Sequence, residues 1–332
     1  MKHLLTLFLL TLTLSSCDPS KKPAVTGSPY EIFVVCPKTI YQGAVGDTLK
    51  SIFEEQVPWL NQGEPIFDLL SIPASALNNI NRKHRNLFIV NIDSSYTKTR
   101  MVRQADSYAS GQMTLSIKSP SADSAALYIS GVRDQIVQIY QQTERDRFVA
   151  RADKYGVPAL ERLIEQKFDF HMAIPLGYRQ RVNGEDYLWI DNSIPIGSQG
   201  IFIYKIPMDE NADSTFFVKS RDAAVRHIPG PVDGSYMATE TQIMPETREV
   251  DINGQNWYET RGYWRVEGDF MGGPFANYIT IHNGELIGID LYLQYPKEGK
   301  RNYMRQLEAL PYTIRFDLGA NNSSEPESDD QE

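Results

Sequence analysis

Cysteine, histidine and basic residues are all scarce in this sequence. Its 332 residues include two cysteines and five histidines, and none of them stands at the spacings that zinc sites use. Lysine and arginine number 33 against 42 aspartates and glutamates, which gives a net charge of −9. Nucleic-acid binding needs a basic surface, so this balance excludes a nucleic acid as the partner. The hydrophobic fraction of 41% is still that of a folded protein rather than of a disordered chain.

Signature motifs of catalysis are missing as well. The chain has no G-x-S-x-G, H-E-x-x-H or G-x-x-x-x-G-K motif, and no G-x-G-x-x-G follows a strand-like run. These motifs supply a serine nucleophile, a zinc site and the phosphate-binding loops of nucleotide enzymes. We therefore predict no catalytic residue, no metal and no cofactor from the sequence.

The N-terminus carries the clearest signal that is present. Residues 4–14 form an apolar stretch of Leu, Thr and Phe behind Lys2. As a helix this stretch would rise only about 16 Å, short of the ~30 Å hydrocarbon core, so it is typical of a secretion signal and not of a permanent membrane span. It ends in the sequence LSSC, which resembles the bacterial lipobox, where cleavage before the cysteine leaves a diacylglycerol on its sulfur. We predict a signal peptide over residues 1–16 and lipid attachment at Cys17.

Two other segments are predicted to lie outside the folded body. Residues 17–28 contain two prolines, a glycine and several small polar residues, which is typical of a tether that holds the body away from the membrane. Residues 319–332 contain acidic residues, no basic residue and little that is apolar, which predicts a disordered acidic tail. A lipidated Cys17 cannot form a disulfide, so Cys36, at the end of an apolar run, is predicted to be a buried thiol.

The N-terminal half, residues 29–167, alternates strand-like and helix-like segments. Short apolar runs predict buried strands, and apolar residues at helical spacing predict helices. We expect strands at Tyr30 to Cys36, Ile66 to Ile72, Leu87 to Ile92 and Met113 to Lys118, and helices at Asp47 to Gln56 and Ala74 to Asn81. A long helical segment, capped by Ser121 or Asp123, is expected to run to Tyr155, and another helix to begin at Pro158.

The C-terminal half, residues 168–318, is predicted to be rich in β-structure. Asn-Gly pairs at residues 183, 253 and 283 each separate strand-like segments, and this dipeptide supplies the two positive φ angles of a type I′ hairpin turn. The expected strands are Tyr187 to Ile190, Ile201 to Ile206, Val250 to Ile252, Asn256 to Thr260, Tyr278 to His282 and Leu286 to Tyr295, with helices at Ser214 to His227 and Lys300 to Leu310.

The predicted fold class is therefore α+β (mixed α/β). Two sheet-containing halves are joined by a long helical segment, and the second half is largely antiparallel. Both halves contain an apolar strand followed by a charged helix, and the sequence leaves open whether they arose by duplication.

One stretch is unusual because aromatic residues and arginines alternate ahead of a glycine-rich segment. The residues singled out are Trp257, Tyr263, Trp264, Arg265, Met271, Gly272, Gly273, Pro274 and Phe275. Aromatic faces beside polar groups bind sugars or peptides. The same pattern also fits a strand whose aromatic side chains fill a core, followed by a tight turn at Met271 to Phe275. We favour the core interpretation and keep the binding surface as the alternative.

The sequence also resembles a family of Bacteroidota lipoproteins known only as a domain of unknown function. Beside the lipobox, the matching pieces are Glu64-Pro65-Ile66-Phe67, His84-Arg85-Asn86, Gly230-Pro231 with Gly234-Ser235-Tyr236-Met237, Met271-Gly272-Gly273-Pro274-Phe275, and Lys300-Arg301 with Arg305-Gln306-Leu307-Glu308. The resemblance implies a globular body in the cell envelope, and it brings no activity, cofactor or catalytic residue. Residues 18–22 lack the acidic run that follows the cysteine of surface-exported lipoproteins in these bacteria, which favours the periplasmic side over the cell surface.

Two functional hypotheses from different classes follow. The first is a lipid-anchored envelope protein without catalytic activity, which contacts the membrane through its lipid and binds a glycan, a peptide or an envelope protein as an assembly partner. The alternative is a glycan-directed envelope hydrolase that uses carboxylates, with Glu259, Glu267 and Asp269 as candidates, because a pair of carboxylates is enough for glycoside hydrolysis. Two carboxyl groups about 5 to 10 Å apart in an open aromatic cleft would favour the enzyme, whereas a filled core without a cleft would leave only surface interactions.

Overall fold

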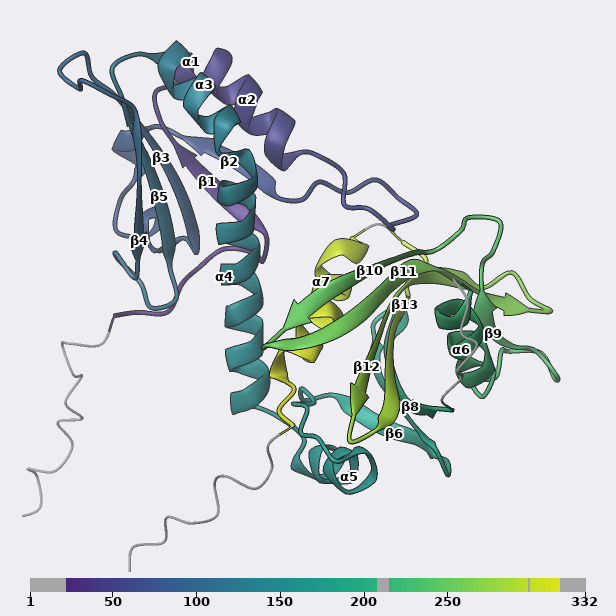
Figure 1. The fold of residues 1–332 in the computed structure, drawn as a ribbon. Helices are drawn as coiled ribbons and strands as arrows, with labels where there is room; N and C mark the ends of the chain where they lie inside the picture. Colours follow the sequence, from purple (N-terminus) through teal and green to yellow (C-terminus); the bar gives the residue numbers. More distant parts are fainter. Residues whose placement is uncertain (1–21, 208–214, 298, 317–332) are drawn as a thin grey trace, which may run out of the picture. The chain divides into compact units, whose positions relative to one another are not determined.

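The computed structural model describes residues 22–207, 215–297 and 299–316, and its fold is α+β as predicted. The chain divides into two compact units, each with its own sheet (Figure 1). The first unit comprises residues up to 48 together with 69–131, and the second comprises 49–68 and the residues from 132 onward.

The first unit is built on a five-stranded sheet. Its strands are β1 (Glu31–Val35), β2 (Asp68–Ile72), β3 (Asn86–Ile92), β4 (Arg100–Ala105) and β5 (Met113–Ser119), in the order β2-β1-β3-β5-β4. Strands β1, β3 and β5 run parallel, while β4 pairs antiparallel with β5 at the edge. The parallel strands were predicted because they are buried apolar runs. Strand β4 was not predicted, because it is mostly exposed and half of its residues are polar, without a regular alternation.

Short helices connect these strands. They are α1 (Lys38–Tyr41), α2 (Ala44–Phe53), the 3₁₀ turns Ala74–Ala76 and Asn81–Lys83, and α3 (Ala122–Gly131), which packs on β3 and β5. The helix predicted at residues 74–81 is wrong, since the structure has only the two 3₁₀ turns there. Ser121 does cap α3, because its Oγ accepts a hydrogen bond from the Ser124 N–H at 3.2 Å.

The predicted long helix is interrupted. Val132 leaves the helical region with φ −114° and ψ 21°, so α3 ends before it and α4 (Arg133–Lys154) begins after it. Helix α5 (Pro158–Phe168) begins with proline in its first turn, as expected. It ends at Asp169, which has a left-handed conformation.

The second unit contains an eight-stranded sheet that curls (Figure 1). Its strands are β6 (Tyr178–Asn183), β7 (Tyr187–Ile194), β8 (Gly197–Ile206), β9 (Tyr236–Thr239), β10 (Glu246–Ile252), β11 (Gln255–Glu267), β12 (Gly272–His282) and β13 (Glu285–Gln294). The order is β10-β11-β12-β13-β8-β7-β6, with β9 paired to the far end of β11. These pairings are antiparallel.

Two of the three Asn-Gly turns form as predicted. Asn253 and Gly254 have φ of 55° and 82°, and Asn283 and Gly284 have 50° and 78°, as a type I′ hairpin requires. The pair at residue 183 is different, because neither of its residues has a positive φ and the strands are joined by the longer connection 184–186.

The curled sheet has a core on each face. On one face, α5 and α7 (Lys300–Ala309) pack against side chains that include Ile190, Trp257 and Leu291. On the other, α6 (Phe216–Val225) covers a cluster that includes Trp264 and Phe275. Alternate residues of a strand point to opposite faces, so the long strand β11 contributes to both cores.

Residues 49–68 join the second unit although they lie early in the chain. The Glu64 carboxylate accepts hydrogen bonds from the backbone N–H groups of Lys300 and Arg301 at 2.7 and 3.0 Å, and so caps α7. Arg301 also pairs with Asp68 at 2.7 Å. The sequence analysis placed the boundary between the halves at residues 167 and 168, but the compact units divide after Gly131. The difference arises because α4 packs on α7 and α5 packs on the second sheet.

Candidate functional site

An open groove of about 640 Å³ lies at the end of the hairpin formed by β11 and β12. Its wall combines aromatic, aliphatic, charged and glycine residues. The lining residues are Leu60, Asn61, Glu240, Ile243, Tyr263, Trp264, Arg265, Val266, Asp269, Phe270, Met271, Gly272 and Gly273. The groove thus contains six of the nine residues of the predicted aromatic and glycine-rich stretch.

Strand β11 positions the polar wall of the groove. The Glu240 N–H donates to the Tyr263 carbonyl at 2.8 Å, which holds the strand at the point where its partner changes from β10 to β9. The Tyr263 ring lies 5.8 Å from the ring of Trp59, and partial burial raises the pKa of its hydroxyl. Arg265 pairs with Glu267 at 2.5 Å while both side chains stay partly exposed. An exposed pair contributes little to stability, so Arg265 can exchange it for a ligand at small cost.

Exposed apolar side chains surround the groove. Phe270 is fully exposed at the tip of the hairpin, and Ile243 and Met244 are 52% and 68% exposed. Of these, Phe270 and Ile243 line the groove, and exposed apolar side chains beside polar groups are common at binding sites. None of these three residues was singled out from the sequence, because a lone Phe, Ile or Met has no periodic signal when it lies in a loop.

The remaining three residues of the predicted stretch, Trp257, Pro274 and Phe275, belong to the core, and Trp264 is buried as well although it contributes to the groove wall. Trp257 is 0% exposed and Phe275 is 1% exposed, and neither lines the groove. Trp264 is 2% exposed, packs edge-on against Tyr292 at 5.9 Å and donates from Nε1 to the Leu293 carbonyl at 3.2 Å. The core interpretation therefore describes these tryptophans, while Tyr263 and Arg265 between them are accessible.

The tight turn predicted at residues 271–275 lies elsewhere. Residues 272–275 already belong to β12, and the chain reverses just before them, where Gly268 has a φ of 92°. Gly273 is needed for packing instead, because a Cβ there would overlap the Leu293 carbonyl oxygen and lie 3.0 Å from Trp264 Nε1. Pro274 follows within the strand, where it is buried.

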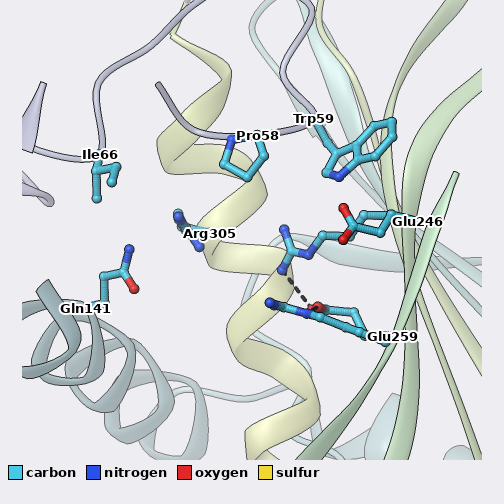
Figure 2. A pocket seen from close by; sticks show the side chains of 9 residues that line it. Pro58, Trp59, Ile66, Gln141, Glu246, Glu259 and Arg305 are labelled. Carbon is cyan, nitrogen blue, oxygen red and sulfur yellow. Dashed lines mark hydrogen bonds and ion pairs between the residues drawn. The ribbon is translucent and has the colours of Figure 1, made fainter. Parts of the chain in front are cut away.

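The three candidate carboxylates do not form a catalytic pair. Glu259, which is labelled in Figure 2, is buried, and its oxygens accept hydrogen bonds from Arg248 at 2.6 Å and from Arg261 and Tyr278 at 2.8 Å. Burial opposes its ionisation, but the bonds and charges of Arg261, with Tyr278 and Arg248, outweigh burial and lower its pKa to about 2. Glu259 therefore stays ionised and cannot serve as a general acid.

The other two carboxylates are occupied locally. Glu267 pairs with Arg265, and Asp269 Oδ1 accepts a hydrogen bond from the Met271 N–H at 3.2 Å. Only Asp269 of the three candidates lines the groove. The groove lining contains no Ser, Cys or His that could act as a nucleophile or general base.

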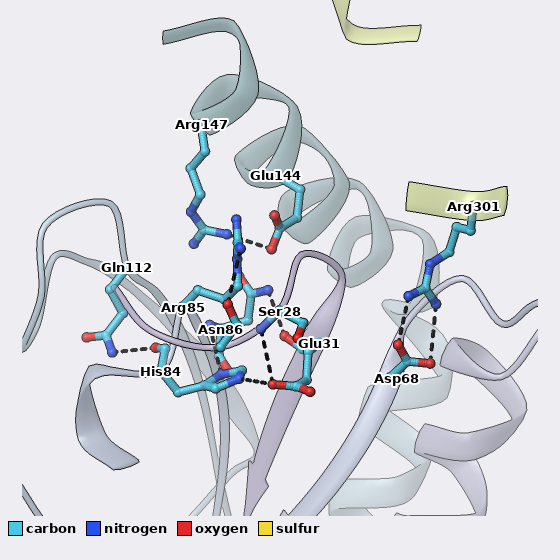
Figure 3. A network of polar contacts seen from close by, with 11 residues as sticks. Ser28, Glu31, Asp68, His84, Arg85, Asn86, Gln112, Glu144, Arg147 and Arg301 are labelled. Atoms are coloured by element: carbon cyan, nitrogen blue, oxygen red, sulfur yellow. Dashed lines mark hydrogen bonds and ion pairs between the residues drawn. The ribbon is translucent and has the colours of Figure 1, made fainter. Parts of the chain in front are cut away.

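The first unit has a buried polar network around His84 (Figure 3). His84 is 2% exposed, with Nε2 at 2.7 Å from Glu31 Oε1 and Nδ1 at 3.0 Å from the Asn86 carbonyl. Its ring stacks on Phe33 at 3.8 Å between centroids, and the Gln112 amide donates to the His84 carbonyl at 2.8 Å. The His84-Arg85-Asn86 segment, one of the segments that carry the family resemblance, therefore has a structural role in the first unit.

Metal-binding clusters and reactive thiols are not found in the part of the chain that the structure describes. It contains no group of three or more His, Cys, Asp or Glu that could hold a metal ion. Cys36 is 1% exposed, as predicted, and burial raises the pKa of its thiol to about 11, which keeps it protonated and unreactive. No helix within residues 22–207, 215–297 and 299–316 has the length and apolarity of a membrane span. Cys17 lies outside the described residues.

Two family models match neighbouring parts of the chain. Residues 25–153 match the model described as Domain of unknown function (DUF8532), and residues 157–313 match Domain of unknown function (DUF4837). The matches meet between α4 and α5. The prediction that the chain is similar to domains of unknown function is confirmed, and neither description states an activity. No curated protein matches the chain.

Several solved structures are distantly similar. CyanoP, the cyanobacterial PsbP of Synechocystis sp. PCC 6803, shares 18% identity over 44% of this chain and 86% of that chain, with a TM-score of 0.29. LpqN, described as involved in cell envelope biogenesis of Mycobacterium tuberculosis, shares 10% identity over 44% and 81%, with a TM-score of 0.28. A protein of Bacteroides thetaiotaomicron VPI-5482 shares 12% identity over 44% of each chain, with a TM-score of 0.18. These low scores leave the function to be argued from the residues of this chain.

Proposed function

We propose that this chain is a lipid-anchored protein of the bacterial cell envelope, and that its second unit is a non-catalytic module that binds an envelope glycan or peptide in the groove. The observation that carries the proposal is the groove itself. Its volume of about 640 Å³ is in the range of ligand sites, and Tyr263 offers an aromatic face beside Arg265, Glu240 and Asp269.

The lining favours binding over catalysis. Charged and amide side chains can exchange hydrogen bonds with sugar hydroxyls or peptide groups, and an aromatic ring can pack against the apolar face of a pyranose or a side chain. The groove lining offers no Ser, Cys or His as a nucleophile with a base, which acyl transfer needs.

Localisation in the envelope rests on the sequence at the N-terminus. Residues 1–16 have the features of a lipoprotein signal peptide, and the lack of an acidic run at residues 18–22 favours the periplasmic side. Two or three acyl chains hold a protein firmly, because each buried CH₂ contributes about 0.8 kcal/mol.

Replacing Cys17 with alanine is expected to abolish lipidation, because the thiol that accepts the diacylglycerol is gone. Detergent partitioning and intact mass of protein from cell membranes measure this outcome. The wild-type chain should enter the detergent phase with the added mass of its acyl chains. An unmodified wild-type N-terminus would contradict the anchor.

Replacing Tyr263 with alanine is expected to weaken ligand binding at least about tenfold, because one buried aromatic contact contributes ~1.4 kcal/mol or more. The mature chain is first screened on glycan and peptide arrays, and the dissociation constant of the retained compound is then measured. Arg265→Gln should weaken binding to a similar degree through its lost charge.

Tyr155 provides a matched control, because it is also an exposed aromatic residue, 51% accessible, and lies outside the groove lining. Tyr155→Ala should leave binding unchanged, and all three variants should retain the wild-type melting temperature within a few degrees. If the wild type and both groove variants bound the ligand equally well, the groove would not be the binding site.

A further inference from the structure

A second, smaller cavity of about 220 Å³ lies within the second unit (Figure 2). Pro58 and Trp59, from the segment between α2 and β2, form one wall, and Arg305 of α7 contributes to another. The β10–β11 pair contributes charged side chains, including Arg248 and Arg261. The cavity therefore brings three guanidinium groups to one small space.

Ion pairs link these arginines into a chain. Glu259 accepts from Arg248 and Arg261, and Glu308 contacts Arg261 at 2.5 Å and Arg305 at 3.1 Å. These ion pairs form a linear network that has an arginine at each end. Its members, in order, are Arg248, Glu259, Arg261, Glu308 and Arg305. Both carboxylates are buried and shared between two arginines, whereas the arginines at the ends each pair with only one of these carboxylates.

Hydrogen-bond donors remain unused in this arrangement. Arg248 bonds Glu259 through Nε and has a 61% exposed side chain, which leaves its terminal amino groups without a partner among the described residues. Arg261 Nε also lacks an acceptor, but it is buried out of reach of a ligand, so the donors available to a ligand are those of Arg248. A planar acceptor with two oxygens matches the fork of a guanidinium group. The cavity thus has the donors for one more carboxylate.

Trp59 and Glu246, on the other walls of the cavity, indicate which kind of ligand carries that carboxylate. Trp59 has a φ of 60°, a conformation that costs a non-glycine residue energy and is often retained where it positions a side chain for a ligand. Glu246 lines the cavity with an exposed carboxylate that makes no ion pair within the described residues. An aromatic ring and a carboxylate that accepts hydrogen bonds are suited to the apolar face and the hydroxyl groups of a sugar ring.

We propose that this cavity binds one hexuronate residue of an acidic glycan, with its carboxylate on the terminal amino groups of Arg248, its ring against Trp59 and a hydroxyl on Glu246. The proposal rests on the proposed function in one respect, namely that the rest of the glycan lies in the neighbouring groove. Trp59 of the cavity and Tyr263 of the groove lie close together, with 5.8 Å between their ring centroids. A phosphate fits less well, because its second charge would face Glu246 and Glu259.

The test is a titration of the mature full-length chain with trigalacturonate and with its methyl ester, which has the same shape and no charge. The acid is expected to bind at least about tenfold more tightly than the ester, the ratio that one charge-assisted hydrogen bond supplies. Arg248→Gln should remove this preference. Glu259 keeps Arg261 and Tyr278 as partners in that variant, so the fold should be retained.

Arg315→Gln is the matched control, because Arg315 is 60% exposed, pairs with Asp153 and does not line the cavity. It should retain the preference for the acid. Glu246→Gln should weaken binding of the acid and the ester alike, because its hydroxyl contact does not depend on the ligand's charge.

The outcomes separate this inference from the proposed function. Equal affinities for acid and ester, both reduced by Tyr263→Ala, would leave the groove as a glycan site and overturn the hexuronate assignment. Binding of the acid that Arg248→Gln does not change, or no binding of trigalacturonate, would also overturn it. Triglycine binding that depends on Arg248 in place of trigalacturonate binding would assign the cavity to a peptide carboxylate instead.

Discussion

Replacing Arg221 with methionine is expected to lower the free energy of unfolding by ~3–5 kcal/mol, because it leaves a buried carboxylate without its counter-charge. Arg221 and Asp290 are both 0% exposed, and Arg221 Nε donates to Asp290 Oδ1 at 2.6 Å. Burial raises the pKa of Asp290 and the charge of Arg221 opposes that rise. A stable domain has only ~5–15 kcal/mol in total, so the loss should be visible as a large shift in a urea denaturation curve.

The Arg221 guanidinium makes other contacts besides this ion pair, so a double variant is needed to isolate the effect of the charges. The Arg221 guanidinium also donates to Thr239 at 2.8 Å and lies 3.6 Å from the centre of the Phe275 ring. A double variant, Arg221→Met with Asp290→Leu, removes both charges and should cost clearly less than the two single variants added together. Additive costs, or a loss below ~1 kcal/mol in the Arg221 variant, would show that the pair does not stabilise the second unit.

Replacing Trp264 with alanine should likewise cost ~3–5 kcal/mol, because it truncates a large side chain in the core. The indole is 2% exposed and its N–H is bonded to the Leu293 carbonyl. Gly273→Val should destabilise as well, since the new Cβ would overlap that carbonyl oxygen. Thermal and urea unfolding measure both effects.

Tyr263 provides the contrast within the same strand. Tyr263→Ala should change the unfolding free energy by less than ~1 kcal/mol while it reduces ligand binding, because its ring lines the groove. If instead Trp264→Ala were as stable as the wild type and had lost its ligand, the assignment of this tryptophan to the core would be wrong.

Local sequence patterns were sufficient for most of the elements. The buried strands β3 and β5 and the antiparallel strands β12 and β13 follow from apolar runs and from the Asn-Gly turns at residues 253 and 283. Strands β4 and β6 are exposed edge strands with charged side chains, so they lack the apolar alternation on which such predictions depend.

Contacts between distant segments could not be predicted in the same way. The sequence shows Glu64-Pro65 and Lys300-Arg301 as separate short pieces, but the structure brings them together because Glu64 caps α7 and Arg301 donates to the Pro65 carbonyl at 2.7 Å. No local periodicity encodes a bond between residues more than two hundred positions apart.

The candidate site shows the same limit. The sequence drew attention to the stretch from Trp257 to Phe275, but it offered a core strand and a binding surface as alternatives. A single strand can contribute to a core and to a binding surface at the same time, because neighbouring residues of a strand point to opposite faces of the sheet. Trp59 and Glu240 complete the two cavities from other parts of the chain, and neither carried a signal in the sequence.

Hydrogen–deuterium exchange of the mature chain, with and without the glycan or peptide that the arrays retain, tests the central claim most directly. The account predicts slower exchange on binding in segments 59–61, 240–243 and 263–273, and unchanged exchange in the five-stranded sheet of the first unit. Protection confined to the first unit, or equal protection in the Tyr263→Ala variant, would contradict it.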